Sequence, residues 1–202
     1  MQLELPDSAT RATIEIDCCR VMTNDEYFDF CMRNQGLHVE RETSGDIIIM
    51  PPAGCETGYR NNEIARQLGN WSIADGRGVA LDPQTEYLLP SGAAYAPDAS
   101  WVLRSRLAAF TKQQKQRFLP LCPDFVVELI SPGDRLSRAK VKMQEWIENG
   151  AQLAWLIDAD RRTIYIYRPD RSAEERTGVE AIAGEGPAAG FMLDLRAIWE
   201  GI

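Results

Sequence analysis

The sequence predicts a mixed fold of the α+β class, in which helices cover the faces of a mixed sheet. Segments with helical spacing of apolar residues are interspersed with short apolar runs that end at turn residues, in the order α, several β, α, β. Hydrophobic residues make up 45% of the chain and charged residues 26%, which is a globular composition. The 202 residues contain no internal repeat and no interdomain linker, so we expect a single domain over 1–202.

The N-terminal part of this domain is expected to contain an extension, a helix and a hairpin. Residues 1–20 form the extension. Within residues 21–57, Thr23 is followed three residues later by Glu26, which is the pattern of a capping box and predicts a helix start. Two short apolar strands that flank the polar turn 43–46 then predict a hairpin.

Residues 58–158 are expected to form the core of the domain. Its first helix has Thr57 as a candidate N-cap, and its last helix ends at Gly150, a C-cap glycine. Buried strands are predicted just before and just after that last helix, and a right-handed crossover joins them if they lie parallel. Residues 159–202 are expected to add strands and a terminal helix that covers the core.

The net charge of the chain limits the kinds of molecule that it is expected to bind. The net charge is -8 and the isoelectric point is about 4.8, which argues against avid, non-specific binding of nucleic acid through a general basic surface. A local basic groove, or a site whose excess carboxylates are neutralised by metal ions, stays open. The stretch 104–117 is locally basic and is read either as a solvated face or as a rim that contacts phosphates.

Histidine and cysteine usage excludes several kinds of site. The single histidine, His38, and the lack of a CxxC pair leave no ligand spacing for zinc and remove most Ser-His and Cys-His nucleophiles. No apolar run approaches about 18 residues and no apolar signal segment is present, so we expect neither a membrane span nor a signal peptide. With an odd number of cysteines and no secretion signal, we expect reduced thiols and a cytoplasmic protein.

A lone carboxylate in a strand that is otherwise apolar is the most informative position. Glu128 lies inside such a run, where an acid is costly unless it is paired or holds a metal. Asp98 follows Pro97 and enters another predicted strand, although aspartate is disfavoured in strands and a turn-capping role is the alternative. If the two strands are neighbours, both acids meet at one end of the sheet. Their repulsion then requires a proton or a cation such as Mg2+ between them.

Lys142 lies on the predicted helix after the Glu128 strand and can reach the same place. A lysine there would stabilise a negatively charged transition state or hold an attacking water, whereas a plain salt bridge to Glu128 is the alternative. Glu40, inside the first hairpin strand, is otherwise a solvent-facing acid. Glu63, in the second turn of the first core helix, is otherwise an exposed acid favoured by the helix dipole.

Five strings follow one another along the chain: GDIIIMPPAGCETGYRNNEIARQL, APDASWV, LCPDFVVELISPGD, KMQEWIENGAQLAWLID and IYRPD. In this order they resemble the Uma-two family of restriction endonucleases over nearly the whole chain. The resemblance implies the αβββαβ core of the PD-(D/E)XK nuclease-like superfamily. That core would consist of a helix over 58–71, strands near 78–89, 97–103 and 124–130, a helix over 136–149 and a strand over 153–157.

The resemblance also implies roles for individual residues. Pro97-Asp98 matches the PD element, and Glu128 matches the acidic element that follows it. Ile130 stands where the superfamily has its lysine, and in the Uma-two pattern the lysine has moved to the next helix, at Lys142. Asp98 and Glu128 would therefore hold a metal ion.

The function implied by the resemblance is a Mg2+-dependent (or Mn2+-dependent) endonuclease that hydrolyses DNA phosphodiester bonds. Glu63 matches a polar position on the first core helix and Glu40 matches an acidic position before the second hairpin strand. Both would complete the metal shell, while Arg60 and the stretch 104–117 would touch the DNA backbone. A nuclease-like fold that only binds a protein or nucleic acid, within a mobile-element or defence system, is the alternative. The edge strands and Trp199 also suggest a homodimer, which a two-strand cutter would need.

Overall fold

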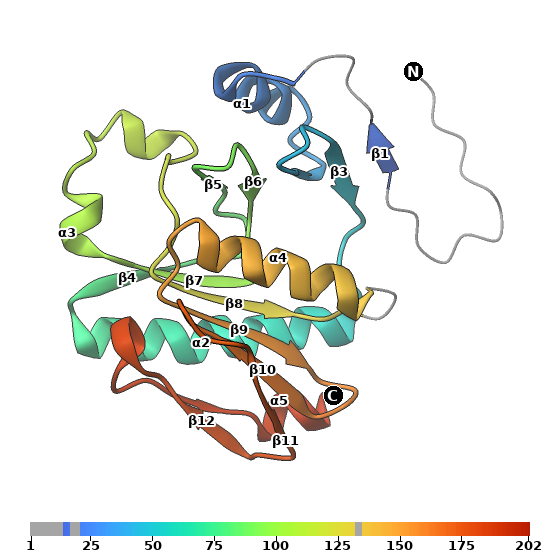
Figure 1. Cartoon of the computed structure of the whole chain (residues 1–202), viewed down its shortest axis with the longest axis vertical. Coiled ribbons are helices and arrows are strands. Elements are labelled where there is room, and N and C mark those ends of the chain that lie inside the picture. The colour runs from blue at the N-terminus through green and yellow to red at the C-terminus, as the bar shows by residue number, and fades with distance from the viewer. Residues whose placement is uncertain (1–13, 17–20, 132–134) are drawn as a thin grey trace, which may run out of the picture.

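The computed structural model describes residues 14–16, 21–131 and 135–202, so most of the expected extension 1–20 lies outside the described residues. The helices are α1 (Asn24–Arg33), α2 (Cys55–Asp75), α3 (Arg104–Leu107), α4 (Leu136–Glu148) and α5 (Arg196–Glu200), with 3-10 turns at Gln114–Gln116 and Gly186–Ala188. The strands are β1 (Ile14–Ile16), β2 (His38–Arg41), β3 (Ile47–Met50), β4 (Gly78–Leu81), β5 (Tyr87–Leu88), β6 (Ala94–Tyr95), β7 (Ala99–Leu103), β8 (Phe125–Leu129), β9 (Leu153–Asp158), β10 (Thr163–Tyr167), β11 (Glu174–Thr177), β12 (Ala181–Ala183) and β13 (Met192–Asp194). Figure 1 shows their arrangement.

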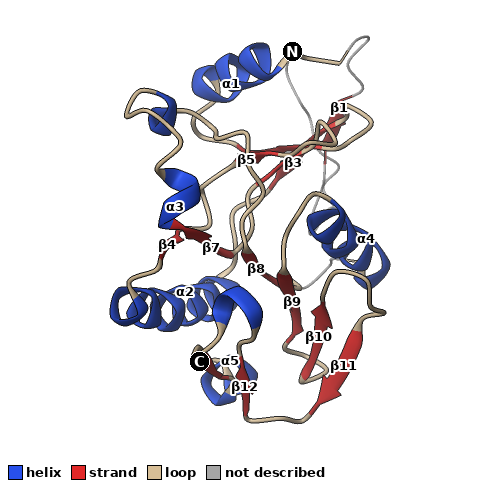
Figure 2. Ribbon diagram, turned by 60° about the vertical axis from the view of Figure 1, so that its left-hand side comes forward, coloured by secondary structure: helices blue, strands red, loops and turns tan. Residues whose placement is uncertain are grey.

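The larger sheet has the strand order β11-β10-β9-β8-β7-β4. Strands β8 and β9 run parallel and are connected through α4, while the other neighbouring pairs run antiparallel. Helices α2 and α4 lie on opposite sides of this sheet (Figure 2). The α+β class and the mixed sheet flanked by helices, predicted from the sequence, are therefore confirmed.

Side chains of β8 alternate between the two faces of the larger sheet. Val127 packs in the same core cluster as Ile64 of α2, whereas Val126 packs in the cluster that contains Met143 of α4. Because successive side chains of a strand point to opposite faces, the next even position, Glu128, points toward α4.

The smaller sheet has the strand order β1-β3-β2-β6-β5 and packs against α1. Its own apolar cluster consists of Tyr27, Val39, Ile47, Leu88 and Ala94. Lys142 of α4 pairs with both Glu40 of β2 and Glu128 of β8, which places β2 of the smaller sheet close to the end of β8.

A buried polar network lies between the smaller sheet and α1. The guanidinium of Arg41 donates to Asn24 Oδ1 at 2.6 Å and to two backbone carbonyls, and it lies 4.7 Å from the centre of the Tyr27 ring. The hydroxyl of Tyr27 donates to Glu86, which is only 8% exposed. Burial, with a contribution from the nearby carboxylate of Glu40, raises the pKa of Glu86 to about 8.

The two helix starts differ in how well the sequence predicts them. The capping box of Thr23 and Glu26 is present at the start of α1, as predicted. The prediction of Thr57 as the N-cap of α2 is wrong, because the helix begins after Gly54 and Thr57 lies buried in its first turn. The N-cap of α2 has no side-chain capping bond.

The strand expected near 78–89 is two strands in different sheets. Strand β4 ends at Leu81, and Asp82 begins a turn in which its Oδ1 accepts from the backbone of Gln84 at 3.1 Å and from the hydroxyl of Thr85 at 3.0 Å. Because the chain changes direction there, β4 pairs in the larger sheet and β5 in the smaller one.

Trp199, which was expected to contribute to a homodimer interface, is buried within the chain. Trp199 is 8% exposed, and its indole nitrogen donates to the carbonyl oxygen of Val179 at 2.7 Å. It packs in the core cluster beside α2 and thus stabilises the monomer.

The described cysteines Cys31, Cys55 and Cys122 carry free thiols, while Cys18 and Cys19 lie outside the described residues. Across the described part of the chain, no helix combines the length and the apolar character needed to cross a membrane.

We predict that Gly78→Ala destabilises the protein by about 3 kcal/mol, the upper part of the usual range for overpacking. A Cβ atom at Gly78 would lie 2.1 Å from ring atoms of Trp101, which is fully buried and donates to Ser72 Oγ at 3.1 Å. Urea denaturation measures the change. Gly69→Ala, at a helical site of α2 with nothing within 4 Å, is the control and should not lose stability. Equal midpoints for Gly78→Ala and the wild type would contradict the prediction.

We predict that Glu86→Gln flattens the pH dependence of stability. The folded protein holds a proton on Glu86 up to a pKa of about 8, whereas the unfolded chain releases it near the ordinary glutamate pKa of 4.5. The unfolded state therefore binds fewer protons between these pH values. The free energy of unfolding should then fall as pH rises, by at most about 1.4 kcal/mol per pH unit from this group.

Urea denaturation from pH 5 to pH 8 checks the Glu86 prediction. Glutamine has no proton to lose, so the variant should show a shallower slope, while Glu148→Gln on the exposed surface of α4 serves as the control. The same slope in Glu86→Gln and the wild type would rule out this origin of the pH dependence.

Candidate active site

Asp98 and Glu128 lie close together at one end of two neighbouring strands. Asp98 immediately precedes β7, whose first residue, Ala99, pairs with Val127 of β8. The Asp98 carboxylate accepts from the backbone nitrogen of Leu129, the residue after Glu128, and interacts electrostatically with Glu128. The structure thus brings together the two acids that the sequence analysis singled out.

Each acid is held in place by hydrogen bonds from a different element. The backbone nitrogen of Leu129 donates to Asp98 Oδ2 at 2.8 Å, and Asn61 Nδ2 of α2 donates to Asp98 Oδ1 at 2.7 Å. The indole nitrogen of Trp146 on α4 donates to Glu128 Oε1 at 2.9 Å. Both carboxylates are therefore oriented by donors before any ligand binds.

Lys142 joins Glu128 to a third carboxylate. Its Nζ lies 2.9 Å from Glu128 Oε1 and 2.8 Å from Glu40 Oε1 on β2. Glu40 Oε1 also accepts from the backbone nitrogen of Ala96 at 3.1 Å. The Glu40 side chain is 7% exposed, so the solvent-facing alternative for this acid is wrong. We call Glu40, Asp98, Glu128 and Lys142 the acid–lysine cluster.

The electrostatics of the acid–lysine cluster are dominated by burial and by the excess of acids. Burial and the charge of Glu128 raise the pKa of Asp98 to about 7, and burial and Glu40 raise the pKa of Glu128. Burial alone would lower the pKa of Lys142, but the carboxylates of Glu128 and Glu40 outweigh it and raise that pKa. The lysine stays protonated, and three acids share its single positive charge.

Glu63 does not join this cluster. Its carboxylate accepts from Arg66 Nε at 2.9 Å and from Gln67 Nε2 at 3.0 Å, on the side of α2 that approaches Asp194. The hydrogen bond from Arg66 lowers the pKa of Glu63. The residue of α2 that reaches Asp98 is Asn61 instead.

Further residues of the site were missed by the sequence analysis. Asn61 and Trp146 hold the two acids, and the Tyr95 ring lies 5.1 Å from the Lys142 ammonium. His38 lies at the exposed rim, two residues before Glu40 and on the same side of β2. Burial and the charge of Lys142 lower the pKa of His38, while Asp98 opposes this effect. Uncharged residues such as Asn61 and Trp146 carry no signal in a single sequence that distinguishes them from core residues.

The basic residues expected to touch DNA lie elsewhere or are engaged. Residues 104–117 follow the far end of β7, and Figure 1 shows α3 at the opposite end of the sheet from the start of α4. Arg106 pairs with Asp124 at 2.9 Å. Arg60 is 9% exposed and pairs with Glu56 at 2.9 Å, so its expected contact with a DNA backbone is not supported.

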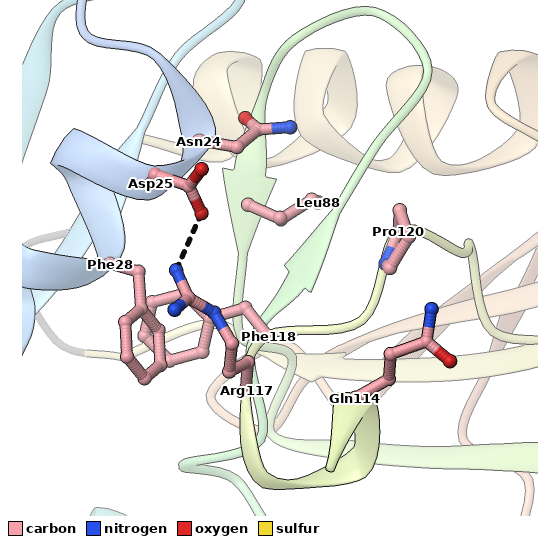
Figure 3. Close-up of a pocket in the computed structure, with 8 residues that line it drawn as sticks. All are labelled: Asn24, Asp25, Phe28, Leu88, Gln114, Arg117, Phe118 and Pro120. Atoms are coloured by element: carbon pink, nitrogen blue, oxygen red, sulfur yellow. Dashed lines mark hydrogen bonds and ion pairs between the residues drawn. The ribbon is translucent and has the colours of Figure 1, made fainter. Parts of the chain in front are cut away.

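A surface pocket of about 250 Å³ lies away from the acid–lysine cluster, between α1, β5 and the segment before β8 (Figure 3). Its lining is Asn24, Asp25, Phe28, Leu88, Gln114, Arg117, Phe118 and Pro120. Arg117 bridges the pocket by pairing with Asp25 at 2.6 Å and by stacking 4.2 Å from the centre of the Phe28 ring. No member of the cluster lines the pocket, so we do not assign it to the candidate active site.

The donor set of the cluster fits a hard divalent ion bound by few protein ligands. Within residues 21–131 and 135–202, no group of three or more histidine, cysteine, aspartate or glutamate side chains is arranged to hold a metal. Mg2+ is commonly bound through one or two carboxylates and several waters, so the Asp98–Glu128 pair suffices for this mode. It does not suffice for a site made only of protein ligands.

Comparison with known proteins supports the fold and identifies the family. A search of curated proteins found no match. A crystal structure from Anabaena variabilis, titled as a putative nuclease belonging to DUF820, aligns with a TM-score of 0.70 and 19% identity. The alignment covers 89% of this chain and 98% of that chain, and at this identity it shows the shared fold. The family model Uma2, described as "Putative restriction endonuclease", matches residues 24–196. The chain therefore belongs to the Uma2 family, the Uma-two family that its sequence resembles.

Proposed function

We propose that this protein is a Mg2+-dependent or Mn2+-dependent DNA endonuclease that hydrolyses phosphodiester bonds. The observation that carries the proposal is that Asp98, just before β7, lies beside Glu128 of β8, with the Lys142 ammonium 2.9 Å from Glu128. Membership of a family described as restriction endonucleases supports the choice of substrate. The free thiols of the described cysteines support a reducing compartment such as the cytosol.

Asp98 and Glu128 would hold the divalent ion. Carboxylate oxygens are the ligands that hard cations prefer, and a cation here would offset both the burial and the repulsion from Glu128 that raise the pKa of Asp98. When bound, such an ion supplies Lewis-acid stabilisation of the phosphoryl oxygens and lowers the pKa of a bound water. The bonds from Leu129 and Asn61 fix both oxygens of Asp98, so little reorganisation is needed on binding.

Lys142 would act as a fixed cation and hydrogen-bond donor. Since the acids raise its pKa, it cannot serve as a base near neutral pH. It can donate to a phosphate oxygen or to the attacking water as negative charge develops on the phosphorus centre. Glu40 holds Nζ at 2.8 Å and so positions the lysine.

Glu128 and Lys142 form a salt bridge, as expected if their role were only structural. A structural pair, however, does not account for Asp98, which adds a third acid next to the pair rather than a second base. The binding-module alternative shares this geometry, and metal binding and DNA cleavage separate it from an enzyme.

We predict that Asp98→Asn and Glu128→Gln each lower Mg2+-dependent cleavage of plasmid DNA by about 100-fold or more, because each removes an anionic ligand from the proposed metal site. Gel assays of nicking and cutting with Mg2+ or Mn2+ measure the effect. Glu63→Gln should retain activity, because its carboxylate is bound by Arg66 outside the cluster. Full activity in both Asp98→Asn and Glu128→Gln would sink the assignment.

We predict that Lys142→Met lowers the cleavage rate by about 100-fold without weakening Mn2+ binding. The variant loses the cation that stabilises the transition state, but it also loses a charge that competes with the ion for Glu128. Cleavage assays and calorimetric titration with Mn2+ give the two readouts. Lys140→Met, on the same helix but 4.0 Å from the Tyr165 ring, is the matched control. A rate equal to that of the control would remove Lys142 from the mechanism.

A further inference from the structure

The amide oxygen of Asn61 is a buried acceptor without a partner. Among the side chains of the described residues, Asn61 Oδ1 and Arg60 Nε are the two buried nitrogen or oxygen atoms that form no hydrogen bond. Leaving a buried acceptor unsatisfied costs about 1–3 kcal/mol. Buried polar atoms in native proteins are almost always paired, so an exception beside Asp98 needs an explanation.

The orientation of the Asn61 amide follows from its neighbour. Its Nδ2 donates to Asp98 Oδ1 at 2.7 Å, and an ionised carboxylate can only accept hydrogen bonds. With Asp98 ionised, as it would be beside a bound cation, the amide oxygen therefore does not turn toward Asp98. Since Oδ1 and Nδ2 are bonded to the same carbon, Oδ1 stays at the same end of the side chain, next to the acid–lysine cluster.

The other unpaired atom does not provide the missing partner. The guanidinium of Arg60 is drawn to Glu56 at 2.9 Å and lies 3.9 Å from Asp160 in the turn after β9. Arg60 Nε and Asn61 Oδ1 are not bonded to each other, although they are neighbours in sequence. A group bound at this site would supply the partner that the described side chains do not supply to Asn61 Oδ1.

We propose that the amide oxygen of Asn61 is the third protein ligand of the divalent ion held by Asp98 and Glu128, a proposal that rests on the function proposed above. A carbonyl oxygen suits Mg2+ and Mn2+. It adds no negative charge to a cluster in which three acids already share one lysine. A neutral third ligand also explains why no third acid completes a metal site within the described part of the chain.

The test is calorimetric titration of the full chain with Mn2+. Asn61→Ala removes the oxygen and should weaken Mn2+ binding by about tenfold or more. Asn61→Asp keeps an oxygen at the same position but loses the amide donor, and it should bind Mn2+ at least as tightly as the wild type. Asn62→Ala, the exposed neighbour on α2, is the control and should match the wild type.

The possible outcomes separate this inference from the proposed function. A wild type that binds no Mn2+ removes the metal site and the role of Asn61 together. Wild-type binding that Asn61→Ala changes by less than twofold overturns the ligand role alone and leaves the Asp98–Glu128 site intact. If Asn61→Ala does not fold, Asn61→Asp decides by itself, because binding weaker than that of the wild type shows that only the donated hydrogen bond to Asp98 matters.

Discussion

The two ion pairs of Lys142 are the interactions on which the arrangement of the site depends. They connect β2 of the smaller sheet, α4 and β8 of the larger sheet through one ammonium group. A buried pair gains little relative to apolar residues of equal volume, but removal of one partner costs about 3–5 kcal/mol because the other charge stays buried. The cluster thus fixes the positions of β2, α4 and β8 relative to one another, which apolar contacts alone would do less specifically.

This constraint leaves the site with more negative than positive charge. Glu40 and Glu128 are both committed to Lys142, and Asp98 faces Glu128 without a cation of its own. Burial and, after it, the charge of Glu128 raise the pKa of Asp98. A bound divalent cation would relieve it, so the electrostatic tension and the proposed catalytic use of the site have the same origin.

The sequence predicted which residues meet where the order of strands in the sheet determines it. It did not predict which side of a helix a residue faces. Asp98 and Glu128 meet because β7 and β8 are neighbours, which the apolar runs suggested. Glu63 and Asn61 are two residues apart on α2, and at about 100° per residue they point to nearly opposite sides of the helix. Only Asn61 faces Asp98. Likewise, residues 104–117 lie at the other end of β7 from Asp98, because Asp98 precedes this strand and residue 104 follows it.

The displaced lysine also has a geometric account. Position 130 lies two residues beyond Glu128, so the two side chains share one face, and Ile130 packs in the apolar cluster under α4. The side chain of Lys142 extends from α4 toward that same face and contacts Glu128. A lysine at 130 would project from the strand, whereas Lys142 is also bound by Glu40 of the other sheet. The position on the helix therefore places the charge beside Glu128 and anchors it with a second carboxylate, Glu40.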